Sequence, residues 1–313
     1  GEPKIKKEDL ASISDVLGTC TTAYASSGAS RSGNIANGVS KINGHVLMPG
    51  ETLSGYECMH PFTTANGYAT AAAYENGQVV DSVGGGVCQI STTLYNASLR
   101  AELEITQRQN HSMIVTYVKP SEDAAIAGTY KDLKITNNYS TPIYVEGYTS
   151  GKTLTFTIYG KETRPANRTF KFVSETLATM DPGPPKEEVD PSMEPGTRKQ
   201  VQSAHRGYKS RLWKYVYIDG VEQSKEILHT DTYNASKAIV KVGPAAPAVT
   251  VPLPEETTAP VETTPVEPTP VEGVDGGPGV TEPTPETAAP APVSTPDPVP
   301  APQPGGSDET PVQ

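Results

Sequence analysis

Cys88 has the surroundings expected of a nucleophilic thiol. Three glycines, Gly84, Gly85 and Gly86, come just before it, and a polar Gln-Ile-Ser-Thr-Thr run follows it. The glycines allow positive φ values and close approach to a ligand, and the apolar periodicity downstream predicts a helix that begins at or just after Cys88. The N–H groups and positive dipole end of such a helix stabilise a thiolate and can donate to an oxyanion. The alternative is that Cys88 is a small buried hydrophobe and the glycines only form a tight turn.

His111 is the histidine that best fits the base that such a thiol needs. It leads directly into a β-rich run at 113–118, so it would lie at the mouth of a strand beside the Cys88 helix. The other histidines are interpreted as turn, surface or packing residues: His45, His60, His205 and His229. A hydrogen-bonded histidine at a sheet edge is the alternative interpretation of His111.

An aspartate is expected to orient the imidazole, as in other catalytic triads. If residues 111–118 pair with 125–132 through a turn near 119–123, Asp132 faces His111. Asp132 is therefore the predicted third residue, and Asp123 is the rival, which would otherwise cap the turn. A slip of one residue reverses the faces of a strand, so the register leaves both aspartates open.

The spacing of cysteines and histidines does not predict a metal site. The sequence has no C-x-x-C or H-E-x-x-H pattern. The glycine run lacks a following Lys-Ser/Thr, so it is not a phosphate-binding loop. No metal or organic cofactor is expected. The chain has 3 cysteines, so at least one thiol is unpaired.

The elements that must position these residues predict an α+β domain. Apolar residues at helical spacing predict a helix over 87–104: Ile90, Leu94, Ala97 and Ala101. Downstream the period shifts toward two, which predicts strands at 113–118, 132–137, 143–148 and 154–159. The expected fold is a central helix headed by Cys88 and packed on an antiparallel sheet, followed by a small all-β module and a disordered tail.

Composition divides the 313 residues into five segments. They are an incoming linker (1–18), the α+β catalytic domain (19–178), a Pro-rich linker (179–194), a small β module (195–243) and an acidic Pro/Thr-rich tail (244–313). In the module, Asp219-Gly220 is the dipeptide typical of a tight hairpin turn. The tail contains 19 of the 30 prolines and cannot bury enough apolar surface to offset the entropy lost on ordering.

Charge and hydropathy exclude two classes of protein. The formal charge of −11 comes from the tail, because residues 1–241 hold equal numbers of acidic and basic residues. The body has no basic stripe, which argues against a nucleic-acid binder. No apolar run approaches the roughly 18 residues needed to cross a bilayer, so membrane contact is expected only through a segment absent from this chain. The chain begins at Gly1, as expected of a processed or truncated product.

Residues 84–97 resemble the signature of VanW-like domains of Gram-positive envelope proteins: Gly-Gly-Gly-Val-Cys-Gln-Ile-Ser-Thr-Thr-Leu-Tyr-Asn-Ala. Further residues that match this family lie on both sides of the signature, at 31–35 and 49–51 upstream and at 111–112 and 132–133 downstream. The resemblance covers about 20–160. Residues 191–243 resemble the small five-glycine wall-associated module, with several of its glycines absent.

This resemblance implies an extracellular L,D-transpeptidase, because some VanW-like domains cross-link peptidoglycan stem peptides between third residues. It implies Cys88 as acyl acceptor and His111 as its base. The implied partners are peptidoglycan stem peptides and glycan strands, in the cell envelope of a Gram-positive bacterium. Cys20 and Cys58 stand where apolar or small residues are expected in this family. A disulfide between them, which would leave Cys88 free, is left open.

Residues around Cys88 and His111 are expected to bind the substrate or its oxyanion. The expected set is Gly85, Gly86, Val87, Gln89, Ser91, Thr92, Arg108, Ser112, Tyr117 and Asp123. Two other functions fit the same sequence. One is a cysteine carboxypeptidase or endopeptidase that trims stem peptides with the same residues and water. The other is a non-catalytic wall-binding or structural protein in which Cys88 is inert.

Overall fold

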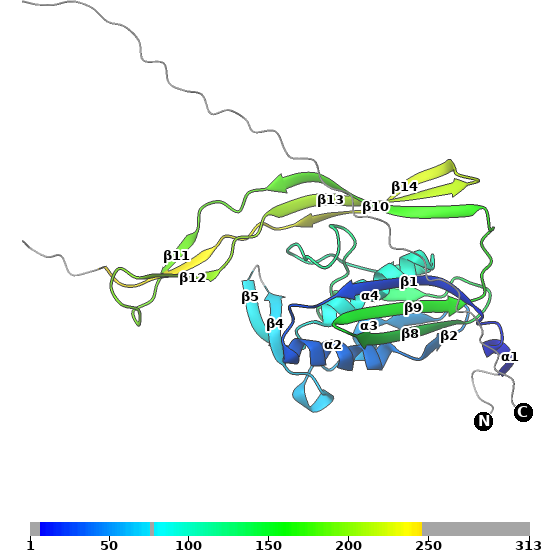
Figure 1. Cartoon of the computed structure of the whole chain (residues 1–313), viewed down its shortest axis with the longest axis horizontal. Coiled ribbons are helices and arrows are strands. Elements are labelled where there is room, and N and C mark those ends of the chain that lie inside the picture. The colour runs from blue at the N-terminus through cyan, green and yellow to red at the C-terminus, as the bar shows by residue number, and fades with distance from the viewer. Residues whose placement is uncertain (1–6, 76–77, 246–313) are drawn as a thin grey trace, which may run out of the picture. The chain divides into compact units, whose positions relative to one another are not determined.

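The computed structural model describes residues 7–75 and 78–245 (Figure 1). Antiparallel sheets dominate, with few helices, and an all-β module follows the body. The predicted α+β class, with its helix headed by Cys88, is thereby confirmed. The predicted disordered tail lies outside the described residues, except for its first two positions.

The main sheet of the body has four antiparallel strands in the order β1-β9-β8-β2. Its strands are β1 (Asp15–Ala23), β9 (Thr153–Gly160), β8 (Ile143–Ser150) and β2 (His45–Leu47). The predicted strands at 143–148 and 154–159 are therefore confirmed. β1 and the short helix α1 (Lys7–Leu10) begin within the segment expected to be an incoming linker.

Helices α2 (Ala29–Ile42) and α4 (Val87–Arg100) pack against this sheet and against each other. α4 contacts β1 and β9, and α2 contacts β8 (Figure 1). The apolar spacing that predicted α4 is confirmed by burial, because the four residues that carry it are fully buried: Ile90, Leu94, Ala97 and Ala101. α4 is thus the central helix of the body.

The three glycines place Cys88 in the first turn of α4. They follow the hairpin of β4 (Thr70–Glu75) and β5 (Gln78–Val83). Gly84 and Gly86 have φ values of 91° and 114°, which favour glycine. Gly85 lies against β4, where a Cβ atom would be 2.6 Å from the Ala71 carbonyl oxygen.

A second sheet has the order β3-β7-β6 and includes β3 (Thr52–Ser54), β7 (Lys134–Thr136) and β6 (Glu104–Gln107). Between β3 and the β4–β5 hairpin lie the short helix α3 (Gly55–Met59) and the 3₁₀ turn η1 (Thr64–Asn66). The predicted strand at 113–118 is wrong, because residues 110–126 form an irregular loop. The hairpin of 111–118 with 125–132 is also wrong, since the described bridges in this region join only residues 127, 129 and 131.

The module consists of two three-stranded sheets. One has the order β10-β13-β14, with β10 (Arg168–Met180), β13 (Gly207–Ile218) and β14 (Val221–Tyr233). The other has the order β11-β15-β12, with β11 (Lys186–Val189), β15 (Ile239–Val242) and β12 (Arg198–Gln202). The turn at Asp219 and Gly220 is confirmed by positive φ values of 49° and 78°.

The change from body to module comes earlier than the expected boundary at 178. β10 begins at Arg168 and pairs with β13 from Arg168 to Met180, with an irregularity between Thr176 and Ala178. The expected Pro-rich linker at 179–194 contains β11, which pairs with β15. Prolines therefore flank this strand without preventing it.

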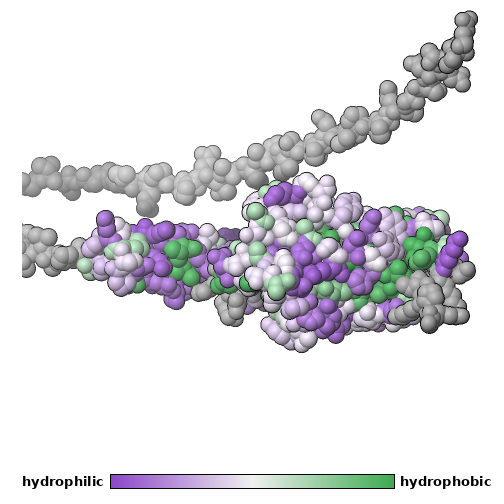
Figure 2. Space-filling view, turned by 90° about the horizontal axis from the view of Figure 1, so that it is seen from below, coloured by the Kyte–Doolittle hydropathy of each residue, from purple (hydrophilic) through white to green (hydrophobic). Residues whose placement is uncertain are grey.

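The described surface is mixed. On the face in Figure 2, polar and neutral residues predominate, and apolar residues gather toward the end of the body that carries α1. Among the described residues, no helix is both long enough and apolar enough to span a membrane.

Replacing Gly18 by alanine tests how closely β1 packs on α4. A Cβ atom there would lie 2.3 Å from the Ala101 nitrogen and 2.5 Å from the Ala97 oxygen, both of them backbone atoms. We expect Gly18→Ala to lower the free energy of unfolding by about 3 kcal/mol, as measured by urea denaturation. The control Gly33→Ala, in open space on α2, should raise it by up to about 1 kcal/mol. An unchanged urea midpoint for Gly18→Ala would contradict this packing.

Candidate functional site

Cys88 lies between the N-terminus of α4 and the loop 110–126. Its Sγ atom is 3.5 Å from both the amide nitrogen and the carbonyl oxygen of Ile126. The amide can donate to a thiolate, and a protonated thiol can donate to the carbonyl. The His111 imidazole lies close enough to the Cys88 thiol to lower the pKa of that thiol. The predicted nucleophile and base are thus brought together.

His111 is held by Asp123. The Asp123 Oδ2 atom accepts hydrogen bonds from the His111 ring nitrogen Nδ1 at 2.6 Å and from the His111 amide at 2.7 Å. Both side chains are buried. Because Nδ1 donates to Asp123, the other ring nitrogen, Nε2, is directed to proton transfer with the thiol. Cys88, His111 and Asp123 therefore form a Cys–His–Asp arrangement.

Asp132 does not face His111, so the predicted pairing between these two residues is wrong. Its carboxylate accepts from the Ser54 hydroxyl at 2.5 Å and from the Tyr56 amide at 2.8 Å. These contacts satisfy donors at the start of α3. The physical reason is that residues 111–118 and 125–132 do not form the hairpin on which the prediction depended.

The second oxygen of Asp123 has two further donors. Asp123 Oδ1 accepts from Arg108 Nη2 at 3.1 Å and from the Tyr233 hydroxyl at 2.5 Å. The carboxylate therefore accepts four hydrogen bonds, which is about the number that its lone pairs can serve. Burial alone would raise the pKa of Asp123, but His111 and Arg108 outweigh it and lower that pKa.

The electrostatics favour a thiolate–imidazolium pair. Burial alone would lower the pKa of His111, but its hydrogen bonds to Asp123 and Cys88 raise that pKa to about 9. Burial alone would raise the pKa of Cys88, but the hydrogen bond and charge of His111, with the Ile126 backbone, lower it. At neutral pH the ring is therefore cationic, and its charge favours the anionic form of the sulfur.

The pKa values of the other two thiols shift in the opposite direction. Burial, with nearby Asp132 and Glu57, raises the pKa of Cys58 to about 11. Burial also raises the pKa of Cys20. All three cysteines are free, so the disulfide left open between Cys20 and Cys58 is not formed.

Several residues expected to bind substrate have structural partners instead. The Ser91 and Thr92 hydroxyls, both buried, bond the Ala124 carbonyl oxygen at 2.7 and 3.1 Å. Buried Gln89 bonds the Thr22 hydroxyl through Nε2 and accepts from a guanidinium, that of Arg31, through Oε1. These side chains hold the loop and the start of α4.

The remaining expected residues lie around the same loop. Arg108 is buried between Asp123 and Asp231, and the Ser112 carbonyl oxygen accepts from Asn234. Tyr117 lies near Thr92 and Cys88, and burial together with the charge of Cys88 raises the pKa of its phenol.

Some backbone groups at the start of α4 already have hydrogen-bond partners within the chain. The Val87 amide donates to Gly84 and the Gln89 amide donates to Gly86, at 3.2 and 3.0 Å. The Gly85 carbonyl oxygen accepts from the Asn34 side chain. The amides of Gly86 and Cys88 are therefore the better candidates for an oxyanion hole.

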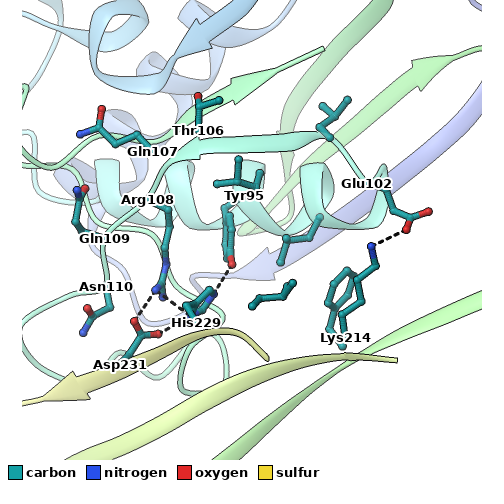
Figure 3. Close-up of a pocket in the computed structure, with 15 residues that line it drawn as sticks. Tyr95, Glu102, Thr106, Gln107, Arg108, Gln109, Asn110, Lys214, His229 and Asp231 are labelled. Atoms are coloured by element: carbon teal, nitrogen blue, oxygen red, sulfur yellow. Dashed lines mark hydrogen bonds and ion pairs between the residues drawn. The ribbon is translucent and has the colours of Figure 1, made fainter. Parts of the chain in front are cut away.

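A pocket of about 700 Å³ lies away from the reactive sulfur (Figure 3). It is lined by the second half of α4, by β6 with the segment after it, and by β10, β13 and β14. Cys88 and His111 are not among its lining residues, and Arg108 links it to Asp123. In Figure 3, Arg108 points toward Asp231 and His229, and His229 bonds the Tyr95 hydroxyl.

Sequence reasoning missed the contribution of the module to this site. Tyr233 and Asp231 lie more than 100 residues after the groups that they contact, and no local pattern marks them. His229, interpreted as a surface or packing residue, bonds Tyr95 and Arg108. Within residues 7–75 and 78–245, no cluster of three or more His, Cys, Asp or Glu side chains is placed to hold a metal ion.

Comparison with known families gives two matches. Residues 30–159 match the family described as VanW like protein, and residues 175–245 match the G5 domain. The chain is 38% identical over 161 residues to the uncharacterized protein YoaR of Bacillus subtilis (strain 168), covering 51% of this chain and 53% of YoaR. It is 29% identical over 111 residues to the vancomycin B-type resistance protein VanW of Enterococcus faecalis (strain ATCC 700802 / V583), covering 34% and 40%. The chain therefore spans about half the length of these relatives or less.

Two solved structures resemble parts of the chain. An IgA1 protease G5 domain is 26% identical, with a TM-score of 0.18, and covers 25% of this chain and 94% of its own. The HP0197-G5 structure is 20% identical, with a TM-score of 0.15, and covers 24% and 95%.

Cys88 should be the most reactive thiol at pH 7, because its pKa is lowered and those of Cys20 and Cys58 are raised. We expect iodoacetamide to alkylate it fastest when each peptide is followed by mass spectrometry between pH 5 and 10. His111→Ala should slow Cys88 at pH 7 about tenfold or more, since a lost imidazolium shifts the thiol pKa upward by at least about one unit. Equal rates at Cys88 and Cys58 would contradict the thiolate–imidazolium pair.

Substitutions of Asp123 and Asp132 should have different effects. Asp123→Asn removes the charge that holds the imidazolium, so Cys88 alkylation at pH 7 should fall about tenfold. Asp132→Asn should leave that rate unchanged and lower the free energy of unfolding by about 1 kcal/mol, through weaker support of α3. Slower alkylation in the Asp132 variant alone would show that Asp132, and not Asp123, orients His111.

Proposed function

We propose, from the premise that this chain carries a VanW-like domain followed by a G5 domain, that it is a peptidoglycan L,D-transpeptidase with Cys88 as its nucleophile. The two domains support a cell-wall-associated protein. The finer proposal places it in the extracellular envelope of a Gram-positive bacterium, with stem peptides as substrate and glycan strands as a further partner.

The observation that carries the proposal is the Cys88–His111–Asp123 arrangement. A buried carboxylate orients the imidazole, and the imidazole contacts a thiol at a helix N-terminus. This combination activates a cysteine for attack on a carbonyl carbon. Acyl transfer through a thioester is the chemistry that these groups support best.

In the first step, the Cys88 thiolate attacks the carbonyl carbon of the third residue of a donor tetrapeptide. The amides of Gly86 and Cys88 donate to the developing oxyanion. The bond to the terminal D-alanine nitrogen breaks, and the His111 imidazolium gives its proton to that leaving amine. The products of this step are a thioester on Cys88 and free D-alanine.

In the second step, the side-chain amine of the third residue of another stem attacks the thioester. Neutral His111 takes a proton from this amine, the bond to sulfur breaks, and the thiolate is restored. The new amide joins the third residues of two stems. If water attacks instead, the same groups act as a carboxypeptidase, so exclusion of water decides between transfer and hydrolysis.

Purified protein incubated with disaccharide-tetrapeptides tests this reaction directly. We expect mass spectrometry to detect a cross-linked dimer together with free D-alanine. Cys88→Ala should form neither, because it removes the sulfur that forms the thioester. The matched control Cys58→Ala should keep the activity, since Cys58 lies beside His45 and outside the Cys88–His111–Asp123 arrangement.

Each alternative function predicts a distinct product. A shortened monomer without dimer would indicate a hydrolytic cysteine peptidase. Intact tetrapeptide, with D-alanine absent, would favour a non-catalytic wall-binding protein. Equal activity in Cys88→Ala would reject Cys88 as the nucleophile.

A further inference from the structure

The loop 110–126 carries both His111 and Asp123, yet it contains little secondary structure of its own. Two of its few local backbone bonds run from Glu122 to Lys119 and from Ala125 to Gln109. Because buried backbone polar groups must be paired, a loop of this kind depends on neighbouring elements for its conformation.

One side of the loop is held by α4. The Ala124 carbonyl oxygen accepts from the hydroxyls of Ser91 and Thr92, and the Glu122 carbonyl oxygen accepts from the Asn96 side chain at 2.6 Å. These contacts fix residues 122–124.

The other side is held by strands of the G5 domain and the residue after β14. The amide of Asn234 donates to the Ser112 carbonyl oxygen at 2.7 Å, directly after His111. The Ser174 hydroxyl donates to the Pro120 carbonyl oxygen at 2.6 Å. The Ser210 hydroxyl pairs with that of Ser121 at 2.7 Å. The loop is therefore sandwiched between α4 and the module.

Tyr233 contacts both the loop and Asp123. Its side chain is fully buried, and its hydroxyl accepts from the Ser121 amide at 2.7 Å and donates to Asp123 Oδ1 at 2.5 Å. One residue of the module thus fixes both the backbone of the loop and the carboxylate that orients His111.

Asp231 acts on the same carboxylate through Arg108. Arg108 Nη1 is 2.6 Å from Asp231 Oδ1 (Figure 3). Arg108 Nη2 is 3.1 Å from Asp123 Oδ1. Arg108 also donates from Nε to the Asp123 carbonyl oxygen at 2.7 Å. Asp231 therefore holds the guanidinium in the position from which it reaches Asp123 twice.

We propose that Tyr233 and Asp231 of the G5 domain are positioning residues for the His111–Asp123 pair, so that docking of the module completes the site in the VanW-like domain. This inference rests on the proposed function for its catalytic meaning. It gives the module a role at the reactive site, in addition to any contact with the wall.

Tyr233→Phe in the full chain tests the proposal, because it keeps the buried ring and removes only the hydroxyl. The matched control is Tyr208→Phe, directly opposite Tyr233 in the β13–β14 pair. The first measurement is solvent exchange of the His111 Nδ1 proton by ¹⁵N-resolved NMR. The second is Cys88 alkylation at pH 7, with Cys20 and Cys58 as internal controls for unfolding. Asp123 and Cys88 act directly on the His111 imidazole, and Arg108 and Tyr233 contact Asp123.

We expect Tyr233→Phe to speed exchange of the Nδ1 proton and to slow Cys88 alkylation, each by about tenfold, as for a lost hydrogen bond to a charged group. Tyr208→Phe should match the wild type, and alkylation of Cys20 and Cys58 should be unchanged in both variants. If Tyr233→Phe does not fold, Asp231→Asn gives the same readouts through Arg108. An Nδ1 proton as protected in the folded variant as in the wild type overturns the proposal.

The same data separate this proposal from the proposed reaction. If the wild-type protein does not cross-link stem peptides, but the Nδ1 proton exchanges faster in Tyr233→Phe than in the wild type, the positioning role stands and the transpeptidase proposal fails. If the wild-type protein cross-links stem peptides, but Tyr233→Phe does not change the exchange rate of the Nδ1 proton, the transpeptidase proposal stands and the positioning role fails.

Discussion

A buried carboxylate must find a donor for each of its lone pairs, and Asp123 meets this requirement with groups from three parts of the chain. His111 donates twice from the same loop, Arg108 donates from the segment after β6, and Tyr233 donates from the module. If one of these donors moves away, a lone pair of the buried carboxylate loses its partner. The geometry of the reactive site therefore depends on the contact between the two domains.

Both the apolar and the polar face of α4 contribute to the site. Its apolar residues pack on both neighbours: Ala97 lies against Gly18 of β1, and Ile90 lies against Gly38 of α2. Its polar face, with Thr92 and Asn96, bonds the loop that carries Asp123. Its N-terminus presents Cys88. A helix that is buried in this way is stable only when its polar side chains have hydrogen-bond partners, and here the loop 110–126 supplies several of them.

Burial by itself does not decide whether a cysteine is reactive. Burial disfavours the thiolate at both Cys58 and Cys88. At Cys58 the nearby carboxylates of Asp132 and Glu57 add to this effect. At Cys88 the His111 imidazolium reverses it. The sign of the pKa shift is therefore set by the neighbouring charge, and that charge is present because Asp123 keeps His111 protonated.

Local patterns in the sequence were enough to predict four features: the α4 periodicity, Cys88 in its first turn, the β8 and β9 strands, and the 219–220 turn. The choice of Asp123 over Asp132 as the partner of His111 arises from long-range contacts that no local pattern encodes. The reason is that the expected hairpin does not form: the loop gains its hydrogen bonds from α4 and from the module. Asp231 and Tyr233 meet partners more than 100 residues earlier in the chain, and periodicity and turn patterns act over far shorter separations.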